Sequence, residues 1–136
     1  KLIFSYHGIP KKYLLKGDPY YCFCQKTARL TAERLNLPEG SFKVAFQSRF
    51  GSEKWLEPYV DRVLIDEARN GLEHVQVISP GFSVDCLETL EEISIQYREL
   101  FLNNGGKKFD YIPCLNDTDT HISLIKTIID ENVQNW

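Results

Sequence analysis

The sequence contains no methionine, not even at position 1, in its 136 residues. We expect from this that the chain is a piece of a longer protein. It also has no apolar run of the roughly 18 residues that a membrane-spanning helix requires, and it opens on the short apolar run Leu2–Tyr6 rather than on a signal peptide. These absences predict a domain that does not cross a membrane.

Cysteine occurs four times, but without a spacing typical of a bound metal or a redox pair. Cys22 and Cys24 are separated by one residue, while Cys86 and Cys114 stand apart, so there is neither a C-x-x-C pair nor a zinc pattern. Reduced thiols are the ordinary state of cysteines in cytosolic proteins. We therefore expect reduced cysteines and a cytoplasmic location.

No strong charge of either sign is present, since 16 basic and 19 acidic residues give a formal net charge of -3. Nucleic-acid-binding domains usually carry a basic surplus, so we expect no nucleic-acid partner. The phosphate-binding patterns G-x-x-x-x-G-K-[ST] and G-x-G-x-x-G are absent, as is the nucleophile pattern G-x-S-x-G. Nucleotide binding and serine-hydrolase chemistry are therefore disfavoured.

The sequence does contain a regular alternation of short apolar runs and longer segments with helical periodicity. The apolar runs are Leu2–Tyr6, Phe42–Phe46, Val75–Ser79 and Phe109–Ile112. The helical segments lie at Tyr20–Leu35, from Pro58 to Asn70, from Ser83 to about residue 102, and from about Thr118 onward. This alternation predicts a single α/β domain over residues 1–136: an open, four-stranded parallel sheet with helices on both faces, flavodoxin-like, with strand order 2-1-3-4.

A sheet of this kind also predicts where a ligand binds, because ligands of open parallel sheets lie beyond the carboxyl ends of the strands. The residues that follow the four apolar runs are 7–10, 47–51, 80–85 and 113–116. Phe50, Trp55 and Phe82 add aromatic surface to this rim, which could line a pocket for a flat apolar ligand or pack against a missing half. Exposed Phe50 and Trp55 predict self-association of the isolated domain.

His7 is the most informative residue of the rim. It ends the first apolar run and precedes Gly8 and Pro10, so its imidazole is expected in a loop at the strand end. An imidazole there can accept a proton near neutral pH or bind a metal ion, or it can simply hydrogen-bond a neighbouring loop. His74, before the third run, and His121, in the first turn of the last helix, are expected to be solvated.

Asp85, Glu88 and Glu92 follow one another at spacings of three and four, which predicts three carboxylates along one helical face. The helix dipole explains an acidic residue in the first turn, as at Asp85. Glu92 lies beyond that turn, and three like charges repel one another unless solvent or a cation lies between them. The pattern leaves two interpretations open, a divalent-cation site and a solvated acidic face.

Taken as a set, the rim segments resemble those of ferrochelatases in order and spacing. The matching segments are S-Y-H-G-I-P at 5–10, G-D-P-Y at 17–20, F-Q-S-R-F-G at 46–51, W-L at 55–56, P-G-F-S-V-D-C-L-E-T-L-E-E-I at 80–93, G-G at 105–106 and Y-I-P-C-L-N at 111–116. Each motif alone is weak, but together they are in register over nearly the whole chain.

The resemblance implies that the chain is the C-terminal half of a two-domain enzyme that inserts Fe²⁺ into protoporphyrin IX to form heme, with the porphyrin between two similar α/β domains. It implies catalytic roles for His7 and Glu88. It also implies metal binding by His7, Glu88 and Glu92. The substrate-binding residues that it implies are Tyr20, Gln47, Ser48 and Trp55.

The partners implied by the resemblance are a porphyrin, ferrous iron as a substrate, and an N-terminal domain of the same protein. Peripheral contact with a membrane stays open. No resident cofactor is implied firmly: some ferrochelatases carry a [2Fe–2S] cluster, but the cysteine spacing here lacks a complete ligand set. An isolated half is expected to fold without being active.

Two alternatives to a ferrochelatase remain open at this point. One is a related chelatase that inserts cobalt into a different tetrapyrrole, and the other is a non-catalytic flavodoxin-like module whose acidic rim holds a divalent ion. The segments 47–51 and 55–56 favour the iron enzyme over the cobalt enzyme.

Overall fold

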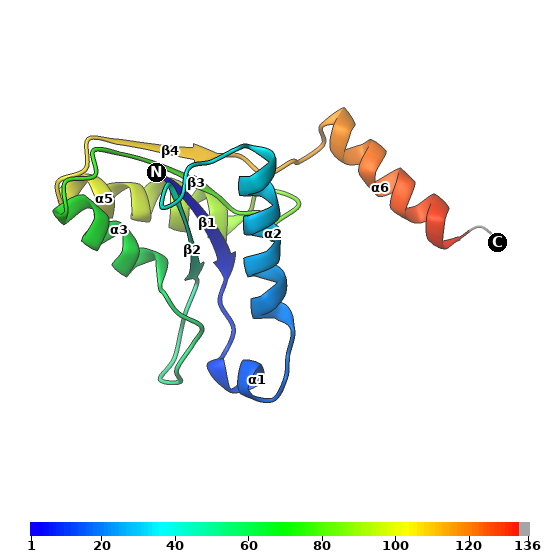
Figure 1. The fold of residues 1–136 in the computed structure, drawn as a ribbon, viewed down its shortest axis with the longest axis horizontal. Coiled ribbons are helices and arrows are strands. Elements are labelled where there is room, and N and C mark those ends of the chain that lie inside the picture. Colours follow the sequence, from blue (N-terminus) through cyan, green and yellow to red (C-terminus); the bar gives the residue numbers. More distant parts are fainter. Residues whose placement is uncertain (134–136) are drawn as a thin grey trace.

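The computed structural model describes residues 1–133 and shows an open parallel sheet with helices on both faces (Figure 1). The strands are β1 (Leu2–His7), β2 (Phe42–Gln47), β3 (His74–Ile78) and β4 (Lys108–Ile112). They are ordered β2-β1-β3-β4, and each neighbouring pair is parallel. The predicted fold class and strand order are confirmed.

The helices follow the expected segments with differences at their ends. They are α1 (Lys11–Leu15), α2 (Tyr20–Arg34), α3 (Val60–Arg69), α4 (Leu87–Leu90), the π-helical η1 (Glu92–Tyr97), α5 (Arg98–Asn103) and α6 (Asp119–Asn132). The short α1 was not expected from the sequence. The helical segment predicted from Ser83 begins only after Cys86, which is its N-cap.

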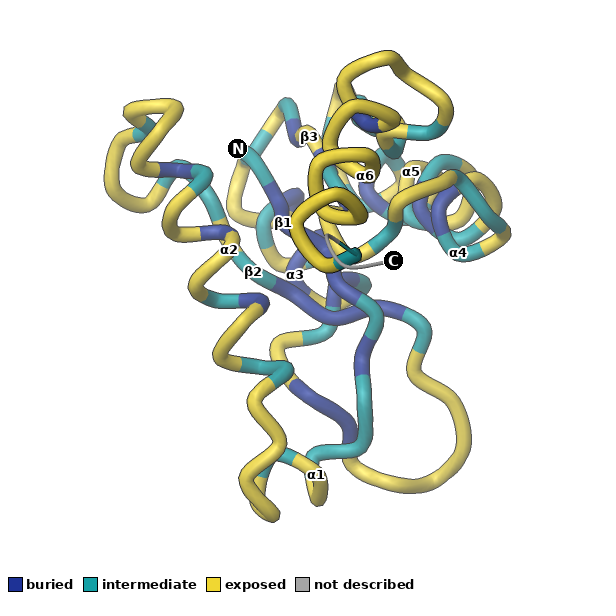
Figure 2. The backbone as a smooth tube through the Cα atoms, turned by 90° about the vertical axis from the view of Figure 1, so that its right-hand side faces the viewer, coloured by how far each residue is buried: buried dark blue, intermediate teal, exposed yellow. Residues whose placement is uncertain are grey.

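The two faces of the sheet carry separate cores because alternate strand residues point to opposite sides. Ile3 and Val75 face a core shared with α3, η1 and α5, whereas Phe4 and Phe46 face a core shared with α2. Figure 2 shows the resulting layers, with buried residues along the strands and along the inward sides of the helices. Both faces of the sheet are thus covered by helices.

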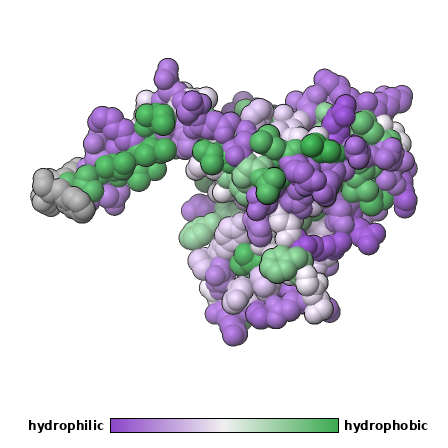
Figure 3. All heavy atoms as spheres, turned by 180° about the vertical axis from the view of Figure 1, so that it is seen from behind, coloured by the Kyte–Doolittle hydropathy of each residue, from purple (hydrophilic) through white to green (hydrophobic). Residues whose placement is uncertain are grey.

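The last helix is an exception to this layered arrangement. α6 extends away from the sheet beyond the end of β4 (Figure 1), and His121 is its buried residue. Its exposed aliphatic side chains are Ile122, Leu124, Ile125, Ile128 and Ile129. Seen from behind, they form a hydrophobic band along the projecting helix (Figure 3).

The surroundings of His121 differ from the expectation. His121 was expected to be solvated, but it is only 5% exposed and its Nδ1 lies 2.6 Å from the carbonyl oxygen of Asn116. That prediction is wrong because the loop before α6 folds over the imidazole.

Among the described residues 1–133, none of the helices has the length and hydrophobicity that a membrane-spanning helix requires.

Candidate active site

The imidazole of His7 lies at the carboxyl end of β1, beside the end of β2, where Gln47 is its partner in the register. Its Nδ1 is 2.6 Å from the carbonyl oxygen of Gly8. Since a carbonyl oxygen can only accept, the proton of a neutral imidazole is on Nδ1, which leaves Nε2 as the basic nitrogen. The ring centroid is 6.3 Å from that of Trp55 and 6.4 Å from that of Phe82. His7 is therefore held at the rim with one nitrogen available for chemistry.

Glu88 lies in the first turn of α4, on the same rim. The Cys86 thiol and a backbone N–H donate hydrogen bonds to its carboxylate, and the nearby His7 adds a favourable charge; together they lower the pKa of Glu88. The carboxylate is therefore ionised at neutral pH. Gln47, the register partner of His7, donates a hydrogen bond of 2.8 Å to the backbone carbonyl of Glu88, so the two predicted residues lie on the same rim.

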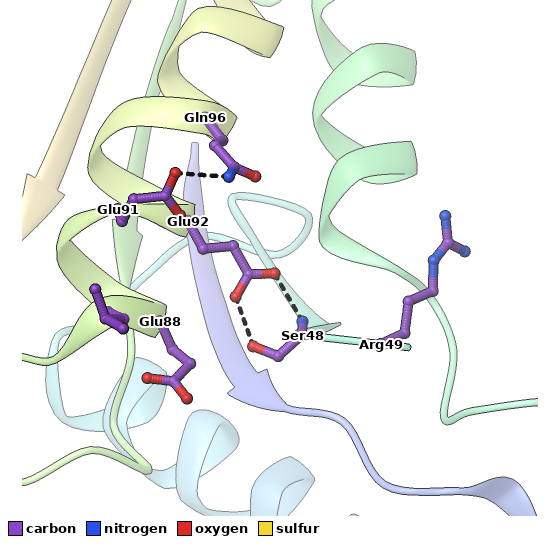
Figure 4. A pocket seen from close by; sticks show the side chains of 7 residues that line it. Ser48, Arg49, Glu88, Glu91, Glu92 and Gln96 are labelled. Atoms are coloured by element: carbon purple, nitrogen blue, oxygen red, sulfur yellow. Dashed lines mark hydrogen bonds between the residues drawn. The ribbon is translucent and has the colours of Figure 1, made fainter. Parts of the chain in front are cut away.

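A pocket of about 280 Å³ opens on this rim, with Glu88 in its lining (Figure 4). Its lining residues are Ser48, Arg49, Leu87, Glu88, Glu91, Glu92 and Gln96. Three of these side chains are carboxylates on the α4–η1 segment, while the guanidinium of Arg49 is paired with Asp61 at 2.8 Å. The pocket therefore presents an excess of negative charge, which suits a cation.

Glu92 lies on this pocket, but its carboxylate is already saturated with hydrogen bonds. The Ser48 N–H and hydroxyl donate to it at 2.8 and 2.5 Å, the Tyr97 hydroxyl at 2.6 Å, and the Gln47 amide at 3.1 Å. A carboxylate has about four acceptor positions, so these donors occupy the capacity that a metal ion would need. These hydrogen bonds anchor Glu92 in the wall of the pocket, and metal binding by Glu92 stays a prediction.

Asp85 does not share a helical face with Glu88 and Glu92, and the prediction of three carboxylates in a row is wrong. Asp85 precedes the helix, and its carboxylate accepts hydrogen bonds from Tyr111 at 2.7 Å and Asn116 at 2.7 Å. The helix starts later than the sequence pattern indicated, so the spacing of three and four does not apply. Asp85 instead fastens the loop after β4 to the start of α4.

Four residues were predicted to bind substrate, and the structure places them at different depths. Tyr20 and Ser48 are half-buried at the rim, and the Tyr20 hydroxyl donates to the His7 carbonyl oxygen at 2.8 Å. Gln47 is 1% exposed and Trp55 is 6% exposed, so both lie beneath the surface. The expectation of an exposed Trp55 is wrong, because Phe50 covers its ring at a centroid distance of 5.1 Å.

The residues that the sequence analysis missed are polar side chains buried under the rim. Ser5, inside β1, and Ser79, directly after β3, are both buried and both direct their hydroxyls to the side chain of Gln47. A serine inside an apolar strand, as at Ser5, was the available signal. Its meaning depends on a partner 42 positions away, which no local pattern indicates.

The family is decided by comparison with known proteins. The family model described as "Ferrochelatase" matches residues 1–133. The chain belongs to the ferrochelatase family. Its likeness to curated ferrochelatases extends over its whole length, with 55% identity to the one from Nitrosococcus oceani, 54% to that from Marinobacter nauticus, and 51% over 99% of the chain to that from Agrobacterium fabrum.

The chain spans well under half the length of the ferrochelatases that it matches. It covers 37% of the proteins from Nitrosococcus oceani and Marinobacter nauticus, and 39% of the one from Agrobacterium fabrum. The family membership therefore applies to a chain that corresponds to part of these proteins.

Among solved structures, a putative cobalamin (vitamin B12) biosynthesis CbiX protein from Marinobacter aquaeolei shares the fold. The TM-score is 0.61 at 15% identity, over 99% of this chain and 98% of that one. At so low an identity the likeness shows the architecture alone.

Within residues 1–133 of this ferrochelatase domain, no group of three or more histidine, cysteine, aspartate or glutamate side chains forms a metal site.

Proposed function

We propose that this chain supplies the His7 and Glu88 side of a ferrochelatase active site, which inserts Fe²⁺ into protoporphyrin IX to form heme. The observation that carries the proposal is the placement of a basic imidazole nitrogen and an ionised carboxylate on one rim, beside an acidic pocket. Family membership supports the same reaction. Fe²⁺ insertion needs the complete enzyme, because the porphyrin is enclosed between this domain and the rest of the protein.

The reaction requires two proton removals and the transfer of a hydrated cation. The two pyrrole N–H groups lose their protons, and the four porphyrin nitrogens replace water on Fe²⁺. Nε2 of His7 can accept a proton, and the Glu88 carboxylate can accept another or hold the cation by charge. Imidazole and carboxylate are both suitable ligands for ferrous iron in transit. We assign both residues to proton removal and metal transfer.

Porphyrin contact is assigned to the side chains that the rim exposes. Ser48 and Tyr20 are half-buried there, and Phe50 is 75% exposed, which gives a flat apolar ligand a surface to lie against. Gln47 and Trp55 support this surface from below. Glu92 holds Ser48, whose backbone lies in the left-handed region at a φ of 63°, a conformation that costs energy for serine and needs such support.

The partner of this domain is proposed to be the N-terminal part of the same protein. Two observations support this: the curated relatives are much longer than the chain, and α6 presents an uncovered aliphatic band. An exposed apolar band of this kind marks a surface to which another protein surface binds. We also propose a cytoplasmic location, which the four unpaired cysteines fit.

The decisive experiment replaces His7 by alanine in the full-length enzyme and measures Fe²⁺ insertion into protoporphyrin. We expect activity to fall more than tenfold, with little change in thermal stability, because a rim histidine contributes little to either core. His74 lies at the amino end of β3, away from the rim, and is paired with Asp110. His74→Ala is therefore a matched control that should retain activity. A His7→Ala enzyme with nearly full activity would contradict the proposal.

The metal preference separates ferrochelatase from the cobalt-inserting alternative. The intact enzyme is expected to prefer Fe²⁺ over Co²⁺ when both are offered anaerobically with protoporphyrin. Preference for Co²⁺ with a different tetrapyrrole would overturn the assignment. A rim that porphyrin does not protect from chemical labelling would point instead to a non-catalytic module.

A further inference from the structure

The side chain of Gln47 connects the strand that carries His7 to the helix that carries Glu88. The backbone carbonyl of Gln47 accepts a hydrogen bond of 2.9 Å from the N–H of Gly8, the residue directly after His7. Its side-chain amide donates a hydrogen bond of 2.8 Å to the backbone carbonyl of Glu88. One residue therefore contacts the backbone at both members of the proposed catalytic pair.

The orientation of the Gln47 amide is fixed by its surroundings. The amide oxygen accepts the Ser5 hydroxyl at 2.6 Å and faces the Ser79 hydroxyl at 3.5 Å, while the nitrogen faces Glu88 and Glu92. Reversing the amide would place oxygen against oxygen on the helix side. A buried amide with all its partners in place is rigid, since each lost hydrogen bond would leave an unpaired group away from water.

We propose that Gln47 is a positioning residue that sets the separation of the His7 imidazole and the Glu88 carboxylate. This role rests on the proposed function of that pair. At 1% exposure, with both polar atoms engaged, Gln47 offers a porphyrin no surface, so it acts through the two residues beside it. Gly8 makes the arrangement close: a Cβ atom there would lie 3.0 Å from both the Gln47 carbonyl oxygen and the Trp55 ring.

The amide contact matters because it joins the backbone of Glu88 itself to the strand end, whereas the Ser48–Glu92 and Asp85–Asn116 contacts hold the neighbouring turns. α4 is four residues long, and it passes directly into the π-helical η1. Without the Gln47 donor, the first turn of α4 loses its direct hydrogen bond to the strand end, and the carboxylate of Glu88 can shift relative to β1. A displacement of about 1 Å between reacting groups can cost on the order of a hundredfold in rate.

The test uses the full-length enzyme with Gln47→Met, which keeps the length of the side chain and removes its hydrogen bonds. We expect kcat to fall by roughly ten- to a hundredfold, while the KM for porphyrin is unchanged. Binding of Co²⁺ without porphyrin, followed by calorimetry, should weaken in parallel. Val63→Ala, in the core under α3, serves as a control that lowers stability without touching this network.

A second variant covers the case in which Gln47→Met does not fold. Gln47→Asn keeps a buried amide but shortens the side chain by one methylene, which withdraws the amide nitrogen from the Glu88 carbonyl. It should show the same loss of kcat and the same unchanged KM. A raised KM in either variant would make Gln47 a substrate contact, and a kcat equal to that of Val63→Ala would make it only a stabilising residue; each result overturns the positioning role.

The outcome also distinguishes this inference from the proposed function beneath it. An active His7→Ala enzyme that binds Co²⁺ normally overturns the proposed function itself. An inactive His7→Ala enzyme beside a fully active Gln47→Met enzyme overturns only the positioning role.

Discussion

Two cysteines that are one residue apart on α2 meet opposite surroundings. Cys22 is exposed, whereas Cys24 faces the core on that side of the sheet and is nearly fully buried. Burial raises the pKa of the Cys24 thiol to about 11, and a hydrogen bond with Tyr20 offsets only part of this effect. The sequence showed the spacing of the two thiols, but the difference in their chemistry comes from which helical face meets the sheet.

Thiol alkylation should therefore separate the two cysteines. With iodoacetamide at pH 8, we expect Cys22 to react at the rate of a free thiol and Cys24 to react only after unfolding, because the thiolate is the reactive form. Peptide mass spectrometry measures both rates. Folding stability should also decline as the pH rises from about 9 towards 11, since the unfolded thiol loses its proton first. Equal labelling of both cysteines would contradict the burial of Cys24.

Asp85 is the second residue whose chemistry depends on distant partners. Burial alone would raise its pKa, but hydrogen bonds from Asn116, Tyr111 and Thr89 outweigh this and hold the pKa of Asp85 well below its usual range. Stability from such a carboxylate is complete above the ordinary aspartate pKa and is lost as the pH falls towards the folded-state value.

Asp85→Asn should lower the free energy of unfolding at pH 7 by about 1–3 kcal/mol, because charge-assisted acceptors are lost. Urea unfolding at pH 7 and at pH 3 measures this change. The difference between the two proteins should shrink at the lower pH, where the Asp85 carboxyl of the unfolded wild-type chain is protonated before that of the folded chain. Asp117→Asn, at an exposed position of the next loop, is the matched control. A constant difference at both pH values would show that the charge does not matter.

At the scale of elements, the α4–η1–α5 segment differs most from its sequence pattern. Hydrophobic periodicity predicted one helix from residue 83, but the first four residues of that stretch are loop, and η1 carries an additional residue in its turn. In η1 the N–H of Gln96 bonds to the carbonyl of Glu91, five residues earlier. This turn brings Tyr97 onto the same side as Glu92, where their side chains bond. π-helical turns often lie at functional sites, and periodicity does not reveal them.

The connection between α5 and β4 offers a test of packing at this scale. A Cβ atom on Gly106 would lie 2.1 Å from the Phe101 ring, which is fully buried. We expect Gly106→Ala to destabilise the domain by about 1–3 kcal/mol, because overpacking forces the ring or the backbone to move.

Chemical denaturation of Gly106→Ala measures this loss, with Lys107→Ala at the next position as the control. Lys107 is exposed and its ammonium pairs with Glu73 at the surface, so its removal should cost less than about 1 kcal/mol. Equal stability of the two variants would mean that the Phe101 ring has room to shift.

At the scale of the whole molecule, the unusual feature is α6. The sequence predicted self-association through Phe50 and Trp55, but Trp55 is buried and the large apolar surface is on α6 instead. Five aliphatic side chains of this helix are 40–54% exposed. Burial of such a band against another protein surface stabilises the helix.

The isolated domain should therefore associate through α6. We expect the double variant Ile125→Lys/Ile129→Lys to be more nearly monomeric than the parent in light scattering after gel filtration. Leu15→Lys, which changes a residue 79% exposed on α1, is the control and should leave association unchanged. The domain alone is also expected to show no heme-forming activity, because half a cleft does not enclose the porphyrin. Association that persists in the double variant would contradict the role of α6.

Much of this protein was determined by its sequence alone. The alternation of apolar runs and helical segments fixed a parallel sheet in the order 2-1-3-4, because periodicity and crossover handedness are local or nearly local properties. The same logic placed His7 and Glu88 at one rim. The tertiary structure alone decided that Gln47 and Trp55 lie beneath that rim, that Glu92 is saturated by donors, and that α6 leaves the sheet. Burial and hydrogen bonding are settled by residues far apart in the chain, and no sequence pattern of one segment contains its distant partner.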